Sequence, residues 1–212
     1  MPSPSIRTGR TGRTGALCGA LSGLLIALPG LIEAFTGETA ATSLLLALAP
    51  ALALPLLPAL HGRQAAVTGR FGESAHALNL IGLGLFGGAA FAANLVLFYF
   101  EEAVIEATLT GPTVPVLIGS AAVFAVGCAL FGTTLVRARV FPRVPSWGYA
   151  VVLPVFAFVT ALPDSLLSSA LHVAVGGILV WLAGALARDG EGAGASRGAT
   201  GAAGAAGTAA GR

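Results

Sequence analysis

The sequence predicts an all-α protein, a polytopic membrane helix bundle with six transmembrane helices. Its composition, its six long apolar stretches and the alternating charge of the segments between them support this prediction. Of the 212 residues, 56% are hydrophobic and only 9% are charged, and the mean hydropathy is +0.88. A soluble domain carries about 25% charged residues. Because so few charges cannot cover a water-facing surface, lipid must surround most of this chain.

The six apolar stretches are the expected spans, and most come close to the ~20 residues that a helix needs to cross a bilayer. They cover residues 16–36, 41–60, 76–99, 113–136, 147–163 and 165–187. The fifth span is the shortest. It is expected to form a helical hairpin with the sixth, because Pro163-Asp164-Ser165 would stop one helix and cap the next.

The segments that connect the spans alternate in charge. All eleven basic residues are arginines, and six alternating spans place every one of them on the same side of the membrane. Eleven arginines and three acidic residues give that side a net charge of +8, whereas the other side has six acidic residues and no base. Positive residues accumulate in cytoplasmic loops. We therefore expect a multi-pass protein of a bacterial cytoplasmic membrane, with both termini in the cytoplasm.

Residues 1–15 and 188–212 flank the expected transmembrane domain of residues 16–187. The first repeats Arg-Thr-Gly three times, and the second is mostly Gly and Ala. Both are expected to be disordered, because neither has enough apolar side chains to build a core. The first span resembles a signal peptide in its basic start, but the apolar run continues through Pro29 and Ile32 without a clear cleavage site. We expect this span to be retained.

Small residues and prolines indicate how the spans pack. Lipid gives helices no hydrophobic reason to associate, so close packing depends on small side chains. The candidate faces are Gly84-x-x-x-Gly88-x-x-x-Ala92 in span 3, Ala121-x-x-x-Ala125 in span 4, and Ala170-x-x-x-Ala174 with Gly177 in span 6. Spans 3, 4 and 6 are therefore expected to form the tight interior. Pro50, Pro55 and Pro58 predict a kinked or broken span 2.

Polar side chains inside the spans are costly in lipid, so they are the first candidates for function. His172 lies seven residues into span 6, about 10 Å below the outer surface. Several other polar groups lie at similar depth or near the same end. The candidate outward-facing polar pocket consists of His172, Asn94, Ser120, Ser168 and Glu33. The alternative is that His172 and Asn94 only hydrogen-bond neighbouring helices, at about 0.6 kcal/mol each.

Ser120 in span 4 and His172 in span 6 also raise the possibility of nucleophilic catalysis. Their placement is similar to that in rhomboid intramembrane proteases, which have a serine in the fourth helix and a histidine in the sixth. That resemblance implies a Ser–His pair in hydrogen-bond contact. The rhomboid serine lies in Gly-x-Ser-Gly, whereas Ser120 lies in Ile118-Gly119-Ser120-Ala121. Both glycines of the motif are missing, so we expect no catalytic residues.

Two histidines are candidate ligands, and two cysteines lie inside the apolar segments. His61 and His76 flank the connection between spans 2 and 3 and could hold a haem or a metal. Only Glu73 offers a further ligand, so we expect neither a metal site nor a cofactor. Cys18 and Cys128 are expected to pack as small apolar residues.

Three further side chains in the spans have expected roles. Asn79, one turn into span 3, is expected to bond across helices. Tyr149 and Trp147 start span 5 and are expected to lie at the membrane interface.

The remaining signals narrow the functional classes. No phosphate-binding, dinucleotide-binding, zinc-hydrolase or Cys-x-x-Cys motif occurs, and no folded basic domain indicates nucleic-acid binding. Residues 135–147, with the sequence LVRARVFPRVPSW, resemble a loop of uncharacterised small multi-pass proteins of high-GC bacteria. This resemblance implies an integral membrane protein and no site residues. The expected function is a non-catalytic membrane subunit or regulator that binds lipid and another membrane protein or its own copy. A small-solute or ion transporter and an intramembrane enzyme are the alternatives.

Overall fold

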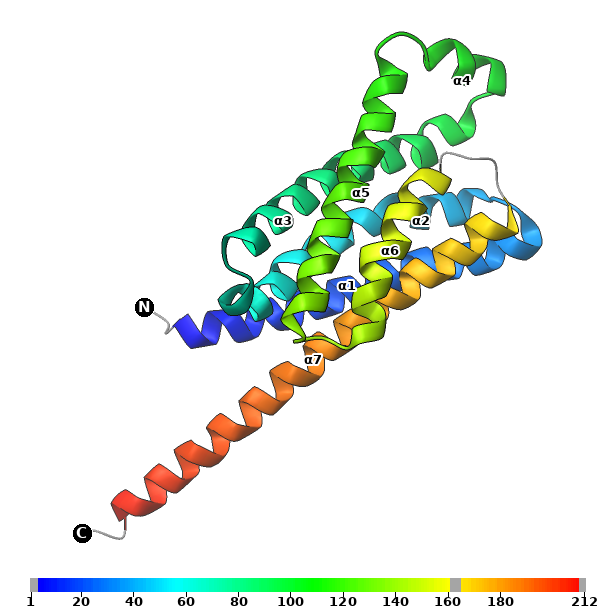
Figure 1. Cartoon of the computed structure of the whole chain (residues 1–212). Coiled ribbons are helices and arrows are strands. Elements are labelled where there is room, and N and C mark those ends of the chain that lie inside the picture. Colours follow the sequence, from blue (N-terminus) through cyan, green and yellow to red (C-terminus); the bar gives the residue numbers. More distant parts are fainter. Residues whose placement is uncertain (1–3, 161–164, 210–212) are drawn as a thin grey trace.

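The computed structural model describes the backbone of residues 4–160 and 165–209, and the side-chain surroundings of residues 12–160 and 165–188. All the secondary-structure elements of the described chain are helices, joined by short turns and loops (Figure 1). Its elements are α1 (Pro4–Thr36), α2 (Ala40–Ala53), α3 (Leu56–Leu95), η1 (Leu97–Tyr99), α4 (Glu102–Thr108), α5 (Thr113–Ala138), α6 (Arg143–Val159) and α7 (Leu166–Ala209).

Four segments within the described residues are long and apolar enough to cross a membrane. They are Gly12–Thr36, Ala40–Tyr99, Thr113–Ala138 and Leu166–Arg188, and α6 is a shorter apolar helix. Helices of this kind satisfy their backbone hydrogen bonds internally, which lipid requires. The fold is therefore a helical bundle of a membrane protein, as the composition predicted.

The chain reverses direction inside α3, at Gly69. This residue has φ 52° and ψ −151°, a conformation that essentially only glycine adopts. His61 and His76, on either side of it, stack with ring centroids 4.5 Å apart. An unbroken helix would separate them by about 22 Å along its axis. α3 therefore consists of two helical arms that run back along each other, as the teal ribbon in Figure 1 shows. The predicted connection between spans 2 and 3 is almost wholly helical.

Prolines and capping side chains determine both ends of α2 and the start of α7. α2 begins with a reciprocal capping box between Thr39 and Thr42. It stops at Ala53, and α3 begins after Pro55, so the prediction of a broken span 2 is confirmed. Ser165 caps α7 through a bond to the backbone N–H of Ser168. Residues 163 and 164, the other part of that expected stop signal, lie outside the described residues.

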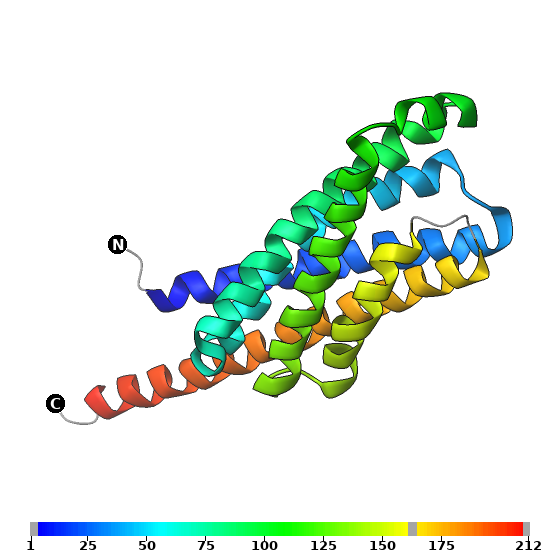
Figure 2. The same ribbon diagram turned by 45° about the horizontal axis from the view of Figure 1, so that its top comes forward.

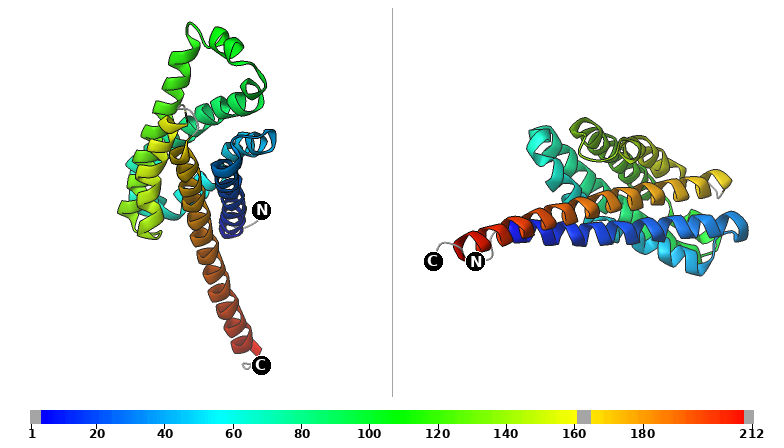
Figure 3. Two further views of the ribbon diagram at one scale, coloured as in Figure 1. Left: turned by 90° about the vertical axis from the view of Figure 1, so that its right-hand side faces the viewer. Right: turned by 90° about the horizontal axis from the view of Figure 1, so that it is seen from below.

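Glycines let three pairs of helices approach closely. α1 lies along α7, where a Cβ on Gly23 would be 2.5 Å from the carbonyl oxygen of Gly176 (Figure 3). α3 meets α5 where a Cβ on Gly82 would be 2.5 Å from the Cα of Phe124. α5 meets α6 where Gly132 lies directly against the backbone of Ala150. These three pairs, together with α2, which packs against α1 and α3, make up the bundle. Figure 2 shows how the helices lie against one another.

The predicted small-residue faces are only partly internal. Ala125 on α5 is buried, but Gly84, Gly88 and Ala92 on α3 and Ala170, Ala174 and Gly177 on α7 are exposed. The expectation that the faces of spans 3 and 6 form the tight interior is therefore wrong. Glycine and alanine are so frequent here that each helix offers several small faces, and the partner helix decides which one is used.

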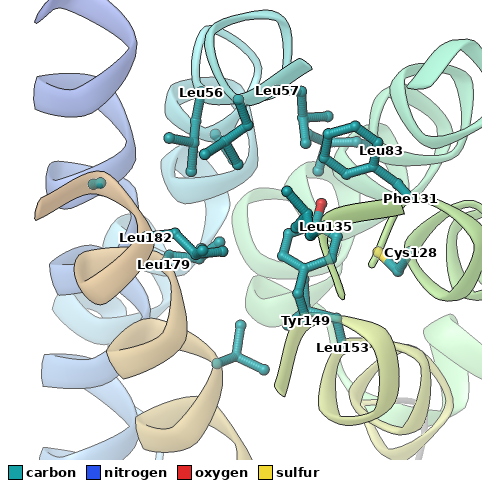
Figure 4. Packing of buried hydrophobic residues seen from close by; sticks show 14 of the residues in the cluster. Leu56, Leu57, Leu83, Cys128, Phe131, Leu135, Tyr149, Leu153, Leu179 and Leu182 are labelled. Carbon is teal, nitrogen blue, oxygen red and sulfur yellow. The ribbon is translucent and has the colours of Figure 1, made fainter. Parts of the chain in front are cut away.

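The core lies between the helix pairs, where buried side chains of α3, α5, α6 and α7 meet (Figure 4). Its most buried large side chains come from α3, α5 and α7. They include Leu56, Leu57, Leu60, Phe131, Leu135 and Leu182. Tyr149 from α6 joins them and is only 2% exposed, so its predicted place at the interface is wrong.

Both terminal helices extend into segments that were expected to be disordered. The helical backbone begins at Pro4 in α1 and continues to Ala209 in α7, where Figure 3 shows it projecting beyond the bundle. Alanine has the highest intrinsic helix propensity, and the second segment is rich in it. The expectation of disorder was based on the shortage of apolar side chains in these segments and gave less weight to the helix propensity of alanine.

Candidate functional site

Three residues of the predicted outer pocket lie along the α1–α7 pair. His172 on α7 is half-buried, and its Nδ1 lies 2.8 Å from the carbonyl oxygen of Ser168. That nitrogen must carry a proton, because a carbonyl oxygen can only accept. Gly30 of α1 lies directly against the Cβ of His172, and Glu33 follows one turn later on α1. Glu33, Ser168 and His172 are thus brought to one end of one helix pair.

Asn94 and Ser120 belong to the α3–α5 pair instead. Asn94 donates from Nδ2 to the carbonyl oxygen of Ala90 at 2.8 Å. Ser120 donates to the carbonyl oxygen of Val116 at 2.8 Å. With Gly82 facing Phe124, Asn94 lies about 12 Å further towards the end of the bundle than Ser120. The structure does not bring these two side chains together.

Aromatic rings fill the space between His172 and α5. The ring of Phe156 on α6 stands edge-on to His172, with centroids 4.9 Å apart. Phe86 on α3 contacts Phe156 and stacks on Phe124 of α5, with centroids 6.3 Å and 4.6 Å apart. His172 therefore packs against an apolar cluster on this side. Of the five residues of the predicted pocket, the structure brings Glu33, Ser168 and His172 to one end of the α1–α7 pair and leaves Asn94 and Ser120 apart from each other on α3 and α5.

A buried polar network connects α3, α5 and α6. Asn79 on α3 donates from Nδ2 to the hydroxyl of Tyr149 on α6 at 2.7 Å. Cys128 on α5 donates its thiol to Oδ1 of Asn79 at 3.3 Å. All three side chains are at most 2% exposed. The expected cross-helix bond of Asn79 is thus confirmed, and Cys128 packs as a buried residue while also donating a hydrogen bond.

A second polar group lies on both sides of the Gly69 reversal. Gln64 is fully buried and donates from Nε2 to the hydroxyl of Thr134 at 2.9 Å. Thr134 in turn donates to the carbonyl oxygen of Phe131 at 2.6 Å. The rings of His61 and His76 lie nearly parallel, only 3° apart, and His76 also contacts Phe131.

Three atoms of this second group have no hydrogen-bond partner among the described residues. They are Nδ1 of His61, Oε1 of Gln64 and Nδ1 of His76, and all three are buried. Buried polar atoms are nearly always paired, so this hairpin is an unusual place in the bundle. We call it the hairpin polar group, consisting of His61, Gln64, His76 and Thr134.

The hairpin polar group does not form a metal centre as it stands. A metal ion lies close to the plane of the imidazole that binds it, and two face-to-face rings have separate parallel planes. They cannot share one ion without rotating. Among the residues whose surroundings are described, no three His, Cys, Asp or Glu side chains gather closely enough to hold a metal.

Sequence reasoning missed three members of these groups, namely Tyr149, Gln64 and Thr134. Tyr149 was assigned to the interface because it stands beside Trp147, and Thr134 gave no signal in an apolar helix. Their partners are 70 residues away in the chain, so only the packing of the helices shows the connection. The spacing of α6 does contain a clue, since Tyr149, Leu153 and Phe156 share one helical face and all three are buried.

Comparison with family models, curated proteins and solved structures gives no match for this chain.

Proposed function

We propose that this chain is a six-span protein of a bacterial cytoplasmic membrane that acts as a non-catalytic subunit or regulator of another membrane protein. In this proposal both termini are cytoplasmic. The reversal at Gly69 supports six crossings, because it divides Ala40–Tyr99 into two antiparallel arms. α6 supplies the remaining crossing, and its 17 residues span about 25 Å.

The orientation follows from the charges. In the six-crossing arrangement every arginine lies on one side and the acidic helix α4 lies on the other. A reporter enzyme that is active only in the cytoplasm, fused in turn to each terminus, tests this. Both fusions are expected to be active, and an inactive fusion at either end of the intact chain would contradict the topology.

One observation carries the proposal of a subunit role: an open small-residue face on the second arm of α3. A Cβ built on Gly84 or on Gly88 meets no atom within 4 Å. Ile81 and Leu85, on the same side, are 58% and 46% exposed. Small residues spaced in this way allow another transmembrane helix to approach closely and pack against the apolar side chains around them. We name this surface the α3 face, consisting of Ile81, Gly84, Leu85, Gly88 and Ala92.

The α3 face is tested by filling it. The full chain is purified from its native membrane after chemical cross-linking, and bound membrane proteins are quantified for the wild type and for Gly84→Ile/Gly88→Ile. The substitution should abolish a specific complex. It should not impair folding, because isoleucine favours helices more than glycine does. Gly119→Ile is the matched control, since Gly119 on α5 also faces open space.

The outcomes separate clearly. Loss of a partner only in the Gly84→Ile/Gly88→Ile variant supports the subunit role. A wild-type chain that carries no membrane partner, or a partner retained equally by both variants, refutes it.

A second candidate function is transport of a small solute or an ion, which the hairpin polar group favours. A polar solute would supply hydrogen-bond partners to its three unpaired buried atoms. The break between α2 and α3 lies at the start of the arm that carries His61 and Gln64. Measuring the flux of small solutes and ions across vesicles reconstituted with the full chain distinguishes a transporter from a subunit. Lost flux with an intact complex in His76→Leu or in His172→Leu/Asn94→Leu supports a carrier. Unchanged behaviour of these variants supports the subunit.

A further inference from the structure

A concave site opens where α5 ends and α6 begins. It is an open, shallow site with a volume of about 660 Å³, lined by Val136, Arg137, Arg139, Arg143 and Trp147. We call it the arginine site. The turn between α5 and α6 that forms this site contains Phe141, whose side chain is 4% exposed and packs into the core. The backbone that carries the site is thus held against the core, while all three arginines are exposed.

The charge of the arginine site is positive without compensation from its own helices. Neither α5 nor α6 contains an acidic residue. The carboxyl end of α5 carries partial negative charge and the amino end of α6 carries partial positive charge. These helix-end charges are similar in size and lie side by side, so they largely cancel. The three guanidinium groups therefore dominate, and planar guanidinium groups match the oxygens of a phosphate.

Arg139 holds a backbone conformation that costs free energy. Its φ of 56° and ψ of 24° lie in the left-handed region, and it is the only described non-glycine residue with positive φ. This region disfavours a side chain, and glycine would adopt it freely. The strained turn places a third guanidinium beside those of Arg137 and Arg143. Strain of this kind is often found at binding sites.

The site also has an apolar side. Trp147 is 57% exposed, and Val144, one residue after Arg143, is 67% exposed. Tryptophan prefers the level of the lipid headgroups. A surface that joins guanidinium groups to exposed apolar side chains suits a molecule with a phosphate next to hydrocarbon.

We propose that the arginine site binds the phosphate group of an anionic phospholipid at the inner surface of the membrane. A free phosphate compound from the cytoplasm shares the same chemistry and is the other possible source. The proposal goes beyond the subunit role and does not need it. It uses the proposed orientation only for the expectation that the site faces the cytoplasmic leaflet.

The test measures contact between lipid and Trp147. The full chain with Trp181→Phe, which leaves Trp147 as the single tryptophan, is reconstituted in phosphatidylcholine vesicles. Either phosphatidylglycerol or phosphatidylcholine with brominated chains is then added as a quencher. Stronger quenching by the anionic lipid at equal concentration is expected. Arg137→Gln/Arg143→Gln should weaken this preference about thirty-fold, the effect of removing two basic residues near an anionic surface.

Two further variants make the result specific. Arg13→Gln/Arg70→Gln removes the same charge from exposed arginines elsewhere on the chain and should leave the preference unchanged. Arg139→Gly removes a guanidinium and relieves the left-handed strain. It should weaken the preference while the protein unfolds at the same or a higher temperature, so poor folding cannot explain the loss.

Inorganic phosphate distinguishes the two sources. If it displaces the brominated anionic lipid at millimolar concentration, a soluble phosphate compound also uses the site, and the phosphate chemistry is supported. If phosphate has no effect while the lipid preference depends on Arg137, Arg139 and Arg143, the lipid is the ligand. Equal quenching by both lipids, or equal loss in the Arg13→Gln/Arg70→Gln variant, overturns the proposal and leaves these arginines with a role in topology alone.

Discussion

Replacement of Tyr149 by phenylalanine removes one hydroxyl from the interior of the bundle. That hydroxyl accepts a hydrogen bond from Asn79 at 2.7 Å, and both residues are at most 2% exposed. Hydrogen bonds between membrane helices average about 0.6 kcal/mol and reach about 1.7 kcal/mol. A buried amide left without a partner costs about 1–3 kcal/mol. Because the Asn79 amide is fully buried, we expect a loss of about 1–2 kcal/mol in the free energy of unfolding.

The assay is equilibrium unfolding of the purified chain in mixed micelles of mild detergent and dodecyl sulfate, followed by loss of helix. Tyr99→Phe is the matched control. Tyr99 is the only other tyrosine, and it is 62% exposed. Its substitution should change the free energy of unfolding by less than about 0.5 kcal/mol.

A double-mutant cycle separates the hydrogen bond from packing. With Asn79→Ala as the second substitution, the coupling to Tyr149→Phe should be about 0.6–1.7 kcal/mol. If Tyr149→Phe is no more destabilising than Tyr99→Phe and the coupling is zero, the network does not hold α3 against α6, and our account of this part of the core is wrong.

Three other predictions concern the same core. Gly132→Val should cost about 1–3 kcal/mol, because its side chain meets the backbone of α6; the same unfolding assay should show a much smaller effect for Gly119→Val, and equal effects would contradict the close packing. Cys128 is fully buried and Cys18 is partly exposed, so N-ethylmaleimide should modify Cys18 first in the folded protein, and mass spectrometry would reveal the opposite order. Gln64→Leu should change the free energy of unfolding by less than about 1 kcal/mol or raise it, since it removes a buried unpaired oxygen; a loss above about 2 kcal/mol would show that this side chain is fully satisfied.

The helical nature of the chain and most helix ends could be predicted from sequence because lipid permits few alternatives. A span in lipid must be helical, so the apolar stretches show where the helices lie. Local chemistry then marks the boundaries: Pro55 breaks the second stretch and Ser165 caps the last helix. The reversal between spans 2 and 3 was expected from the polar residues 61–75, but its position at Gly69 was not, because these polar residues continue the two helical arms and form no extended loop.

Which face of each helix packs against a neighbouring helix was harder to predict than where the helix begins and ends. Gly84 and Gly88 have the spacing of a packing motif, yet Gly82, two residues earlier, is the one that meets α5. In a helix with many small residues, spacing alone does not identify the partner. The same is true of the candidate site. Asn79 was expected to bond across helices, but its partner Tyr149 could not be identified without knowing which faces meet.

The turn at Gly69 has a consequence for biogenesis. In the proposed topology the two arms of α3 are joined by one non-helical residue, so the polar residues around the turn form no extended loop between them. An arm that entered the bilayer alone would leave its partner pressed against the surface, with apolar side chains in water. The two arms are therefore expected to enter the membrane together as a preformed hairpin. Any residue other than glycine at position 69 should delay this insertion step even where the finished protein tolerates it.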